Sequence, residues 1–337
     1  MTPSAPRFPF DPFPMGWYVI ATADELPPAV VQSHVFCGEE VVLWRDDSGT
    51  AHLHGAYCPH LGAHLGRGGQ VDGPNLVCPF HHFRFRGDGQ CVSTPYGKGP
   101  PKKACLRRYP LVERNGLLLA WWHPEQQQPT FEIPAHDMDG WTSLRTIEWP
   151  LRSHPQETNE NAVDFGHLSV VHGYKELEEL QAFETDGPRF EAGYAMTRAS
   201  KFAGIPVGDV RARFHAQAFG LGYGYVVAEI PAHGLQSRHY VWATPRDGDT
   251  ITLRIGNQLR FTGGPVPAFL RGWVARLIAG KVFEEYISDV RQDWEIWEGK
   301  IYVHPPKLAA GDGPVGTYRQ WCKQFYAGAQ QQAASAR

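Results

Sequence analysis

Two cysteine–histidine pairs have the residue types and spacing for metal chemistry. Cys58 is followed two positions later by His60, and Cys78 is followed three positions later by His81. The 17 residues 61–77 separate the two pairs. Thiolates and imidazoles are ligands of zinc and of iron–sulfur clusters. The pattern therefore predicts a metal centre held by two short loops.

The order of these ligands separates two kinds of metal centre. A structural zinc site usually keeps its two cysteines together and its two histidines together. Here each cysteine has its own histidine, and the surrounding glycines and prolines predict loops with short strands at most. This order favours a [2Fe–2S] cluster of the Rieske type, in which two thiolates hold one iron and two imidazoles hold the other. Neutral imidazoles raise the reduction potential, so the expected chemistry is electron transfer.

Neighbouring residues leave part of the ligand set open. The spacing favours His81 as the ligand, but His82 directly follows it and competes for the role. We expect His64 to lie behind the ligands or at the surface. The other four cysteines are expected to be buried thiols, since the chain is neither short nor evidently secreted: Cys37, Cys91, Cys105 and Cys322.

A second group of ligand residues lies between positions 157 and 172. His167 and His172 are five residues apart, about 140° on an ideal helix, so a helix must end or bend between them if both face one metal. Asn161 and Asp164 precede His167 at steps of three, which would place all three on one helical face. Two imidazoles and one carboxylate, with open positions, form the site with which non-haem Fe(II) activates O2.

The carboxylate is expected far along the chain, on a long helix at about 267–300. An apolar stripe marks that helix: Phe283, Ile287, Val290, Trp294, Trp297 and Ile301. Asp293 lies about 80° from the centre of the stripe and Asp289 about 120°. A buried ligand belongs near the edge of the core, so Asp293 is the predicted third ligand and Asp289 the reserve.

These motifs together resemble the Rieske non-haem iron oxygenases. Residues 57–89 are similar to the Rieske domain of that family, and 161–172 match its Asn-x2-Asp-x2-His-x4-His motif. The residues around both cysteines most resemble the sterol-directed branch, which includes cholesterol 7-desaturases and 3-ketosteroid 9α-hydroxylases. Two positions depart from the usual pattern: Leu61-Gly62 stands for Arg-Gly, and His82-Phe83 stands for Gly-Trp.

The resemblance implies a terminal oxygenase with one [2Fe–2S] cluster, one mononuclear Fe(II) and O2 as co-substrate. It implies that Asp164 is not a ligand but links a cluster histidine of a neighbouring subunit to an iron histidine, in a head-to-tail homotrimer. Asn161 and Asp164 are thus the predicted catalytic residues beside the metal ligands. The expected reaction is hydroxylation or desaturation of a bulky apolar substrate, a steroid or sterol. The alternatives are a Rieske oxygenase acting on a non-steroid, as an aromatic hydroxylase or a demethylase, and an electron-transfer protein without the second iron.

Electrons must come from another protein, because no flavin or nicotinamide motif is present. NAD(P)H would act only indirectly, through a reductase with or without a ferredoxin. A group of basic residues after the cluster motifs either docks an acidic ferredoxin or forms a solvated face: Lys98, Lys102, Lys103, Arg107 and Arg108. Aromatic residues of the second half either line an apolar pocket or belong to the core: Phe202, Phe214, Phe219, Tyr223, Tyr225, Trp242 and Phe261.

The expected fold class is α+β. An all-β domain over 1–125 precedes a catalytic domain over 126–329 with an antiparallel sheet and helices, and 330–337 is expected to be a disordered tail. Strands are predicted near 17–20, 41–44, 117–122, 222–230, 238–244 and 250–259. The resemblance implies that the second domain has the helix-grip (START-like) fold.

Composition sets broad limits on function. The 337 residues are 42% hydrophobic with a formal net charge of −3, and no long basic tract predicts nucleic-acid binding. The start of the chain shows no signal peptide. The longest apolar stretch, 117–122, is too short to span a bilayer. Thiolate ligands need a reducing compartment, so a cytoplasmic protein is expected.

Overall fold

A computed structural model describes residues 7–202 and 205–326 and divides them into two compact units. The N-terminal unit comprises Gly16–Ala135 and Thr244–Gly248. The C-terminal unit comprises the remaining described residues. None of the described helices is long and apolar enough to cross a membrane. The predicted tail at 330–337 lies outside the described residues, and the predicted limits at 125 and 329 stay predictions.

The N-terminal unit contains three small antiparallel sheets. The first orders its strands β1 (Gly16–Thr22), β11 (Leu117–Trp122) and β10 (Leu111–Arg114). The second consists of β2 (Val31–Phe36), β3 (Glu39–Arg45), β4 (Ala51–Gly55) and β9 (Arg108–Tyr109). The third consists of β5 (Gln70–Asp72), β6 (Asn75–Val77), β7 (Arg84–Arg86) and β8 (Cys91–Ser93).

One seven-stranded sheet dominates the C-terminal unit. Its spatial order is β12 (Arg145–Leu151), β18 (Ile251–Phe261), β17 (Leu235–Pro245), β16 (Tyr223–Ile230), β15 (Ile205–Phe219), β14 (Arg189–Phe202) and β13 (Lys175–Asp186). The strands pair antiparallel with their sequence neighbours, apart from β12, which pairs with β18. Two short helices, α1 (Pro155–Glu160) and α2 (Phe165–Val170), lead from β12 into β13.

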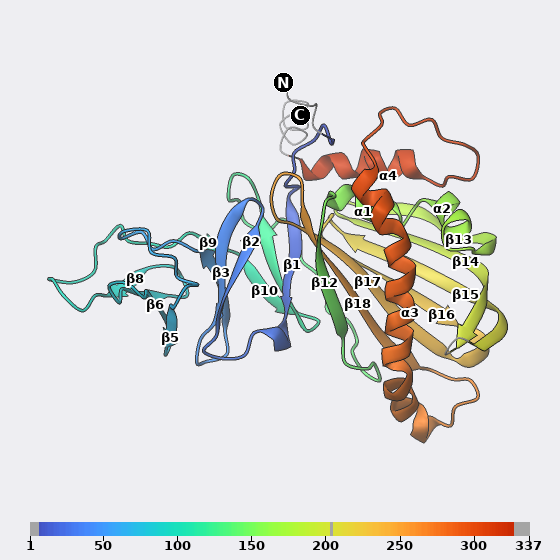
Figure 1. The fold of residues 1–337 in the computed structure, drawn as a ribbon, viewed down its shortest axis with the longest axis horizontal. Coiled ribbons are helices and arrows are strands. Elements are labelled where there is room, and N and C mark those ends of the chain that lie inside the picture. Colours follow the sequence, from blue (N-terminus) through green and yellow to red (C-terminus); the bar gives the residue numbers. More distant parts are fainter. Residues whose placement is uncertain (1–6, 203–204, 327–337) are drawn as a thin grey trace. The chain divides into compact units, whose positions relative to one another are not determined.

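A single long helix, α3 (Arg271–Gly299), crosses one face of this sheet (Figure 1). Alternate residues of β18, such as Leu253 and Ile255, are fully buried against the helix. The helix meets them with Phe283, Val290 and Trp297, which are seven residues apart and therefore share one face. Burying each such side chain contributes about 1.5–3 kcal/mol, and this packing positions the helix for the site. Helix α4 (Val315–Cys322) follows it.

The structure confirms the α+β class and the predicted strands at 17–20, 41–44, 117–122, 222–230, 238–244 and 250–259. The expected single helix face over 161–167 is wrong. Asn161 caps the end of α1 and Asp164 caps the start of α2, because the Asp164 carboxylate accepts a hydrogen bond from the His167 amide at 3.2 Å. Cys105 is exposed, not buried, while the other three spare cysteines are buried as predicted.

Candidate metal centres and substrate cavity

Two loops with matching backbone hydrogen bonds carry the cysteine–histidine pairs. The amide of Cys58 donates to the Ala63 carbonyl at 2.9 Å, and the amide of Gly62 donates to the Cys58 carbonyl at 2.9 Å. The second loop repeats both bonds, from Cys78 to the Phe83 carbonyl at 2.9 Å and from His82 to the Cys78 carbonyl at 3.1 Å. Each loop thus folds back on its own cysteine.

The loops bring like ligands together. The Cys58 and Cys78 side chains are buried beside one another, and burial with the neighbouring Cys78 raises the pKa of the Cys58 thiol to about 11. The rings of His60 and His81 lie 4.7 Å apart between centroids and are partly exposed. A thiol with a raised pKa stays protonated unless a metal ion replaces the proton. Paired thiols beside paired imidazoles fit a [2Fe–2S] cluster with one iron of each kind.

The neighbouring histidines His82 and His64 take different positions in this loop geometry from His60 and His81. His82 is exposed and has a φ of 55°, and it occupies the position that Gly62, with a φ of 75°, takes in the first loop. It is therefore the turn residue of its loop, whereas the ring of His81 faces His60. The His64 ring accepts a hydrogen bond from the Gly66 amide at 3.1 Å and lies 3.8 Å from Glu40.

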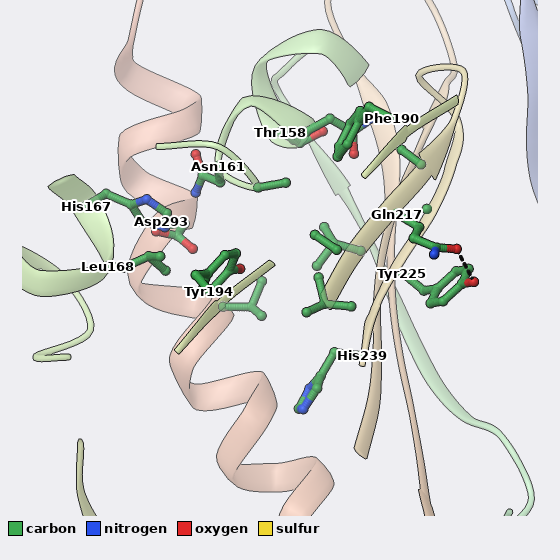
Figure 2. A pocket seen from close by; sticks show the side chains of 18 of the residues that line it. Thr158, Asn161, His167, Leu168, Phe190, Tyr194, Gln217, Tyr225, His239 and Asp293 are labelled. Carbon is green, nitrogen blue, oxygen red and sulfur yellow. Dashed lines mark hydrogen bonds between the residues drawn. The ribbon is translucent and has the colours of Figure 1, made fainter. Parts of the chain in front are cut away.

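The second candidate centre gathers His167, His172 and Asp293 from three elements. Their ligand atoms all lie within 4.8 Å of one another, and His172 Nε2 is 3.4 Å from Asp293 Oδ2. Helix α2 carries His167 and ends at Val170, so His172 lies beyond its end, as the five-residue spacing predicted. Asp293 comes from α3 and is buried (Figure 2).

The surroundings of these residues suit a metal ion. His167 Nδ1 lies 2.5 Å from the backbone oxygen of Asp164, so it donates there and leaves Nε2 free to bind a metal. Burial lowers the pKa of His167, which favours the neutral ring that a metal requires. The buried Nδ1 of His172 has no hydrogen-bond partner among the described residues. Two imidazoles and a carboxylate of this kind fit a mononuclear Fe(II) site.

The two candidate aspartates on α3 have different partners. Asp289 pairs with the Arg198 guanidinium through two hydrogen bonds, at 2.5 and 2.9 Å. That ion pair occupies both carboxylate oxygens, whereas Asp293 faces His172. The Asp164 carboxylate is partly exposed and lies 4.0 Å from His167 Nδ1. Asn161 accepts a hydrogen bond from Trp297 Nε1 at 3.3 Å, which ties the end of α1 to α3.

A cavity of about 180 Å³ adjoins the second centre. Its lining includes Asn161, His167 and Asp293, and further along it reaches His239 on β17 (Figure 2). The lining includes the small residues Ala216, Ala218 and Gly224 of the sheet, which leave the space open. Aromatic and apolar side chains complete it: Tyr194, Phe190, Tyr286, Val226, Val241 and Val290.

The aromatic residues that the sequence left open between pocket and core mostly do not line the cavity, and Phe219, Tyr223 and Trp242 belong to the core. Of the aromatic residues expected there, Tyr225 lines the cavity. Tyr223 and Trp242 are buried and stack on one another, and Phe214 stacks on Tyr194. Phe219 and Phe261 do not line the cavity either, and the side chain of Phe202 lies outside the described residues.

His239 is one of the lining residues that sequence reasoning missed. Its buried Nδ1 has no hydrogen-bond partner among the described residues, and burial lowers the pKa of His239 to about 4. The ring therefore enters the cavity as a neutral group. Only the alternation of β17, which turns His239 and Val241 to the same face, could have signalled its position.

Two family models match this chain, and it is similar to known oxygenases. Residues 16–110 match the Rieske [2Fe–2S] domain, and 120–326 match the 3-ketosteroid 9α-hydroxylase C-terminal domain. Cholesterol 7-desaturase of Xenopus laevis is 27% identical over 331 residues, covering 93% of this chain and 72% of the relative. The oxygenase component of 3-ketosteroid-9-alpha-monooxygenase from Rhodococcus rhodochrous is 25% identical over 336 residues, covering 93% and 84%.

Solved structures share the fold. Dicamba monooxygenase bound to dicamba aligns with a TM-score of 0.67 and 21% identity, over 95% of this chain and 98% of the other. NdmA of Pseudomonas putida CBB5 with caffeine aligns with a TM-score of 0.67 and 17% identity, over 91% and 89%. Since the C-terminal family match covers more than half of the residues, the chain belongs to the Rieske non-haem iron oxygenases, as a terminal oxygenase with a C-terminal domain of the 3-ketosteroid 9α-hydroxylase family.

Proposed function

We propose that this oxygenase hydroxylates or desaturates a bulky apolar substrate of the steroid or sterol class. The observation that carries the proposal is the His167, His172 and Asp293 group, which opens directly onto a largely apolar cavity. The 3-ketosteroid family match and the relatives named for steroid substrates support the substrate class.

In this proposal Cys58, His60, Cys78 and His81 hold the [2Fe–2S] cluster. His167, His172 and Asp293 hold Fe(II), which when bound supplies O2 activation at its open positions. Electrons come from a reductase, directly or through a ferredoxin. The lysines at 98, 102 and 103 are exposed and remain available for docking that donor, whereas Arg107 pairs with Glu39.

The chain's own residues position the reaction. Asp164 caps α2, which carries His167, and its partly exposed carboxylate can accept a hydrogen bond from an imidazole of a second chain. We propose that it links the two kinds of centre in a homotrimer, in keeping with the family motif. Asn161 and Trp297 hold α1, which leads into α2, against α3, so the helices that carry His167 and Asp293 keep their spacing.

The cavity orients the substrate. Its apolar lining would hold the hydrocarbon body, while the neutral ring of His239 would meet a hydroxyl or carbonyl oxygen of the substrate. Binding pockets usually measure about 300–1,000 Å³, and this cavity of about 180 Å³ is smaller. That volume favours a second candidate, the same oxygenase acting on a one- or two-ring substrate.

Iron and acid-labile sulfide per chain test the first part of the proposal. Anaerobically purified protein should hold about three irons and two sulfides. His167→Ala should fall to about two irons with the Rieske absorption spectrum unchanged. Two irons in both proteins, in material shown not to have lost metal, would leave an electron carrier and refute the oxygenase assignment of this site.

Substrate-dependent O2 uptake tests the second part. A panel of steroids, sterols and one-ring aromatic acids and ethers should separate the two substrate classes, with an added reductase as electron source. Ala218→Phe narrows the cavity without touching the metal ligands. It should abolish uptake with the larger substrates and leave the iron content unchanged. O2 uptake that is the same with every compound and unchanged in Ala218→Phe would contradict the assignment of this cavity as the substrate site.

A further inference from the structure

The N-terminal end of α3 carries an exposed apolar ridge that the proposed reaction does not use. Phe269, Trp273 and Leu277 follow at steps of four residues and are 85%, 62% and 67% exposed. Residues four apart lie above one another on a helix, so Trp273 and Leu277 form one edge and Phe269, in the preceding turn, extends it. In the C-terminal unit this end of the helix protrudes past the edge of the sheet (Figure 1).

The opposite face of the same turns explains why the ridge is outside. Ala275 and Ala279 are buried, and they sit about 200° around the helix from Trp273 and Leu277. A helix of a soluble protein usually carries polar residues on the face away from its core. Here that face carries a tryptophan and a leucine instead. Exposed apolar patches of this kind mark interaction sites, so we expect the ridge to contact a partner.

The charges on the segment that carries the ridge are of one sign, and the first acidic residue beyond it, Glu284, pairs with Lys281 at 3.2 Å. Residues 250–283 contain no aspartate or glutamate, and Arg276 and Lys281 are exposed on the first turns of α3. Arg271 holds the preceding loop by donating to the carbonyls of Val266 at 3.2 Å and Thr262 at 3.4 Å. The other half of the helix, 284–298, has six carboxylates and one arginine. The cationic, apolar character is thus confined to one end of α3.

We propose that residues 265–281 dock on an anionic phospholipid surface, with the ridge in the interfacial layer and the cations among the headgroups. Aromatic and leucine side chains on one face and Lys or Arg beside them are the pattern of helices that lie in a membrane interface. Tryptophan favours the headgroup level, and anionic lipids attract basic residues next to it. The segment lies on the membrane and does not cross it.

Other occupants fit these observations less well. A symmetric contact with a second copy would place the same cations opposite one another, which is unfavourable. An acidic soluble protein would neutralise the cations, but its charged surface would not cover the apolar ridge. A lipid surface satisfies both features at once. The inference goes beyond the proposed reaction and holds whatever substrate the cavity takes.

Vesicle co-sedimentation of the full-length protein tests the proposal without any turnover. Wild type should bind vesicles of phosphatidylcholine with phosphatidylglycerol about tenfold more tightly than vesicles of phosphatidylcholine alone, and added salt should weaken the binding. Trp273→Gln should weaken binding to both by about tenfold. Arg276→Gln should weaken binding to the anionic vesicles alone, by about fivefold. Ile296→Gln, which changes an exposed apolar residue elsewhere on α3, should bind as wild type does.

Three results would overturn the proposal. The first is wild type that binds neither kind of vesicle, and the second is Ile296→Gln that loses as much binding as Trp273→Gln. Light scattering could also find that Trp273→Gln lowers the subunit number, which would make the ridge a contact between chains. Iron content and O2 uptake, measured on the same preparations, report on the proposed reaction separately.

Discussion

A buried ion pair between α1 and the end of α3 should stabilise the C-terminal unit measurably. The Glu157 side chain is fully buried, and its Oε2 lies 2.9 Å from Lys300 Nζ, just after the last turn of α3. Lys300 also lies 3.3 Å from Glu160, which Arg319 holds from α4. The network fastens α1, which leads into α2 and His167, to the helix that carries Asp293.

Lys300→Met should leave the Glu157 carboxylate buried without its cation. Removing one partner of a buried ion pair costs about 3–5 kcal/mol. Because the Lys300 side chain is 27% exposed, water reaches this pair and the lower end, about 3 kcal/mol, is expected. In the Glu157→Gln, Lys300→Met double variant no charge is stranded, so its loss should be about 2 kcal/mol smaller than the sum of the single losses.

The stability lost in Lys300→Met should depend on pH in a definite direction. Burial raises the pKa of Glu157 despite Lys300, and removing the lysine should raise it further. A carboxyl whose pKa is raised in the folded state binds more protons when folded than when unfolded. The free-energy cost of burying its charge therefore shrinks as the pH falls toward the pKa of the unfolded chain, near 4.3. The deficit of Lys300→Met should therefore be smaller at pH 5 than at pH 7.

Urea unfolding followed by tryptophan fluorescence measures these differences, and metal analysis follows the site. Lys281→Met is the matched control, since Lys281 lies on the same helix in an exposed pair with Glu284 at 3.2 Å. Exposed pairs contribute about 0–1 kcal/mol, so that variant should change little. The reasoning fails if the two variants lose equal stability, or if the deficit of Lys300→Met grows as pH falls.

Three further predictions follow from the same structure. Asp293→Asn should lose about one iron per chain while Asp289→Asn keeps it, which metal analysis checks; equal loss would contradict the ligand assignment. His82→Gly should raise stability by about 0.5–1 kcal/mol, since a left-handed backbone disfavours a Cβ, with the Rieske spectrum retained; a lost spectrum would instead make His82 a ligand. Burial lowers the pKa values of His54 and His154 to about 3, so between pH 6.5 and 4 the unfolded chain binds more protons. As the pH is lowered through this range, each of the two histidines should lower the free energy of unfolding by about 1.4 kcal/mol per pH unit. Urea midpoints that stay constant below pH 6 would refute this.

The two metal centres differ in how far the sequence alone predicts them. The proposed cluster ligands lie on two short loops, so the spacing of Cys58 and His60, and of Cys78 and His81, predicts most of the local geometry of that site. The break between His167 and His172 was also predictable, because five residues do not return to one face of a helix. The continuous face expected upstream was not found, since Asp164 caps a new helix through its Oδ1.

Contacts between distant segments decided the rest. Asp289 and Asp293 differ by only about 40° around the predicted stripe, and Arg198 from β14 separates them by pairing with Asp289. The cavity depends on small residues brought together from neighbouring strands, and His239 reaches it through the register of β17 against β16. Ligand types and short-range spacing are local properties of a chain, whereas partners and cavities depend on which strands pair, and long-range pairing leaves no local pattern.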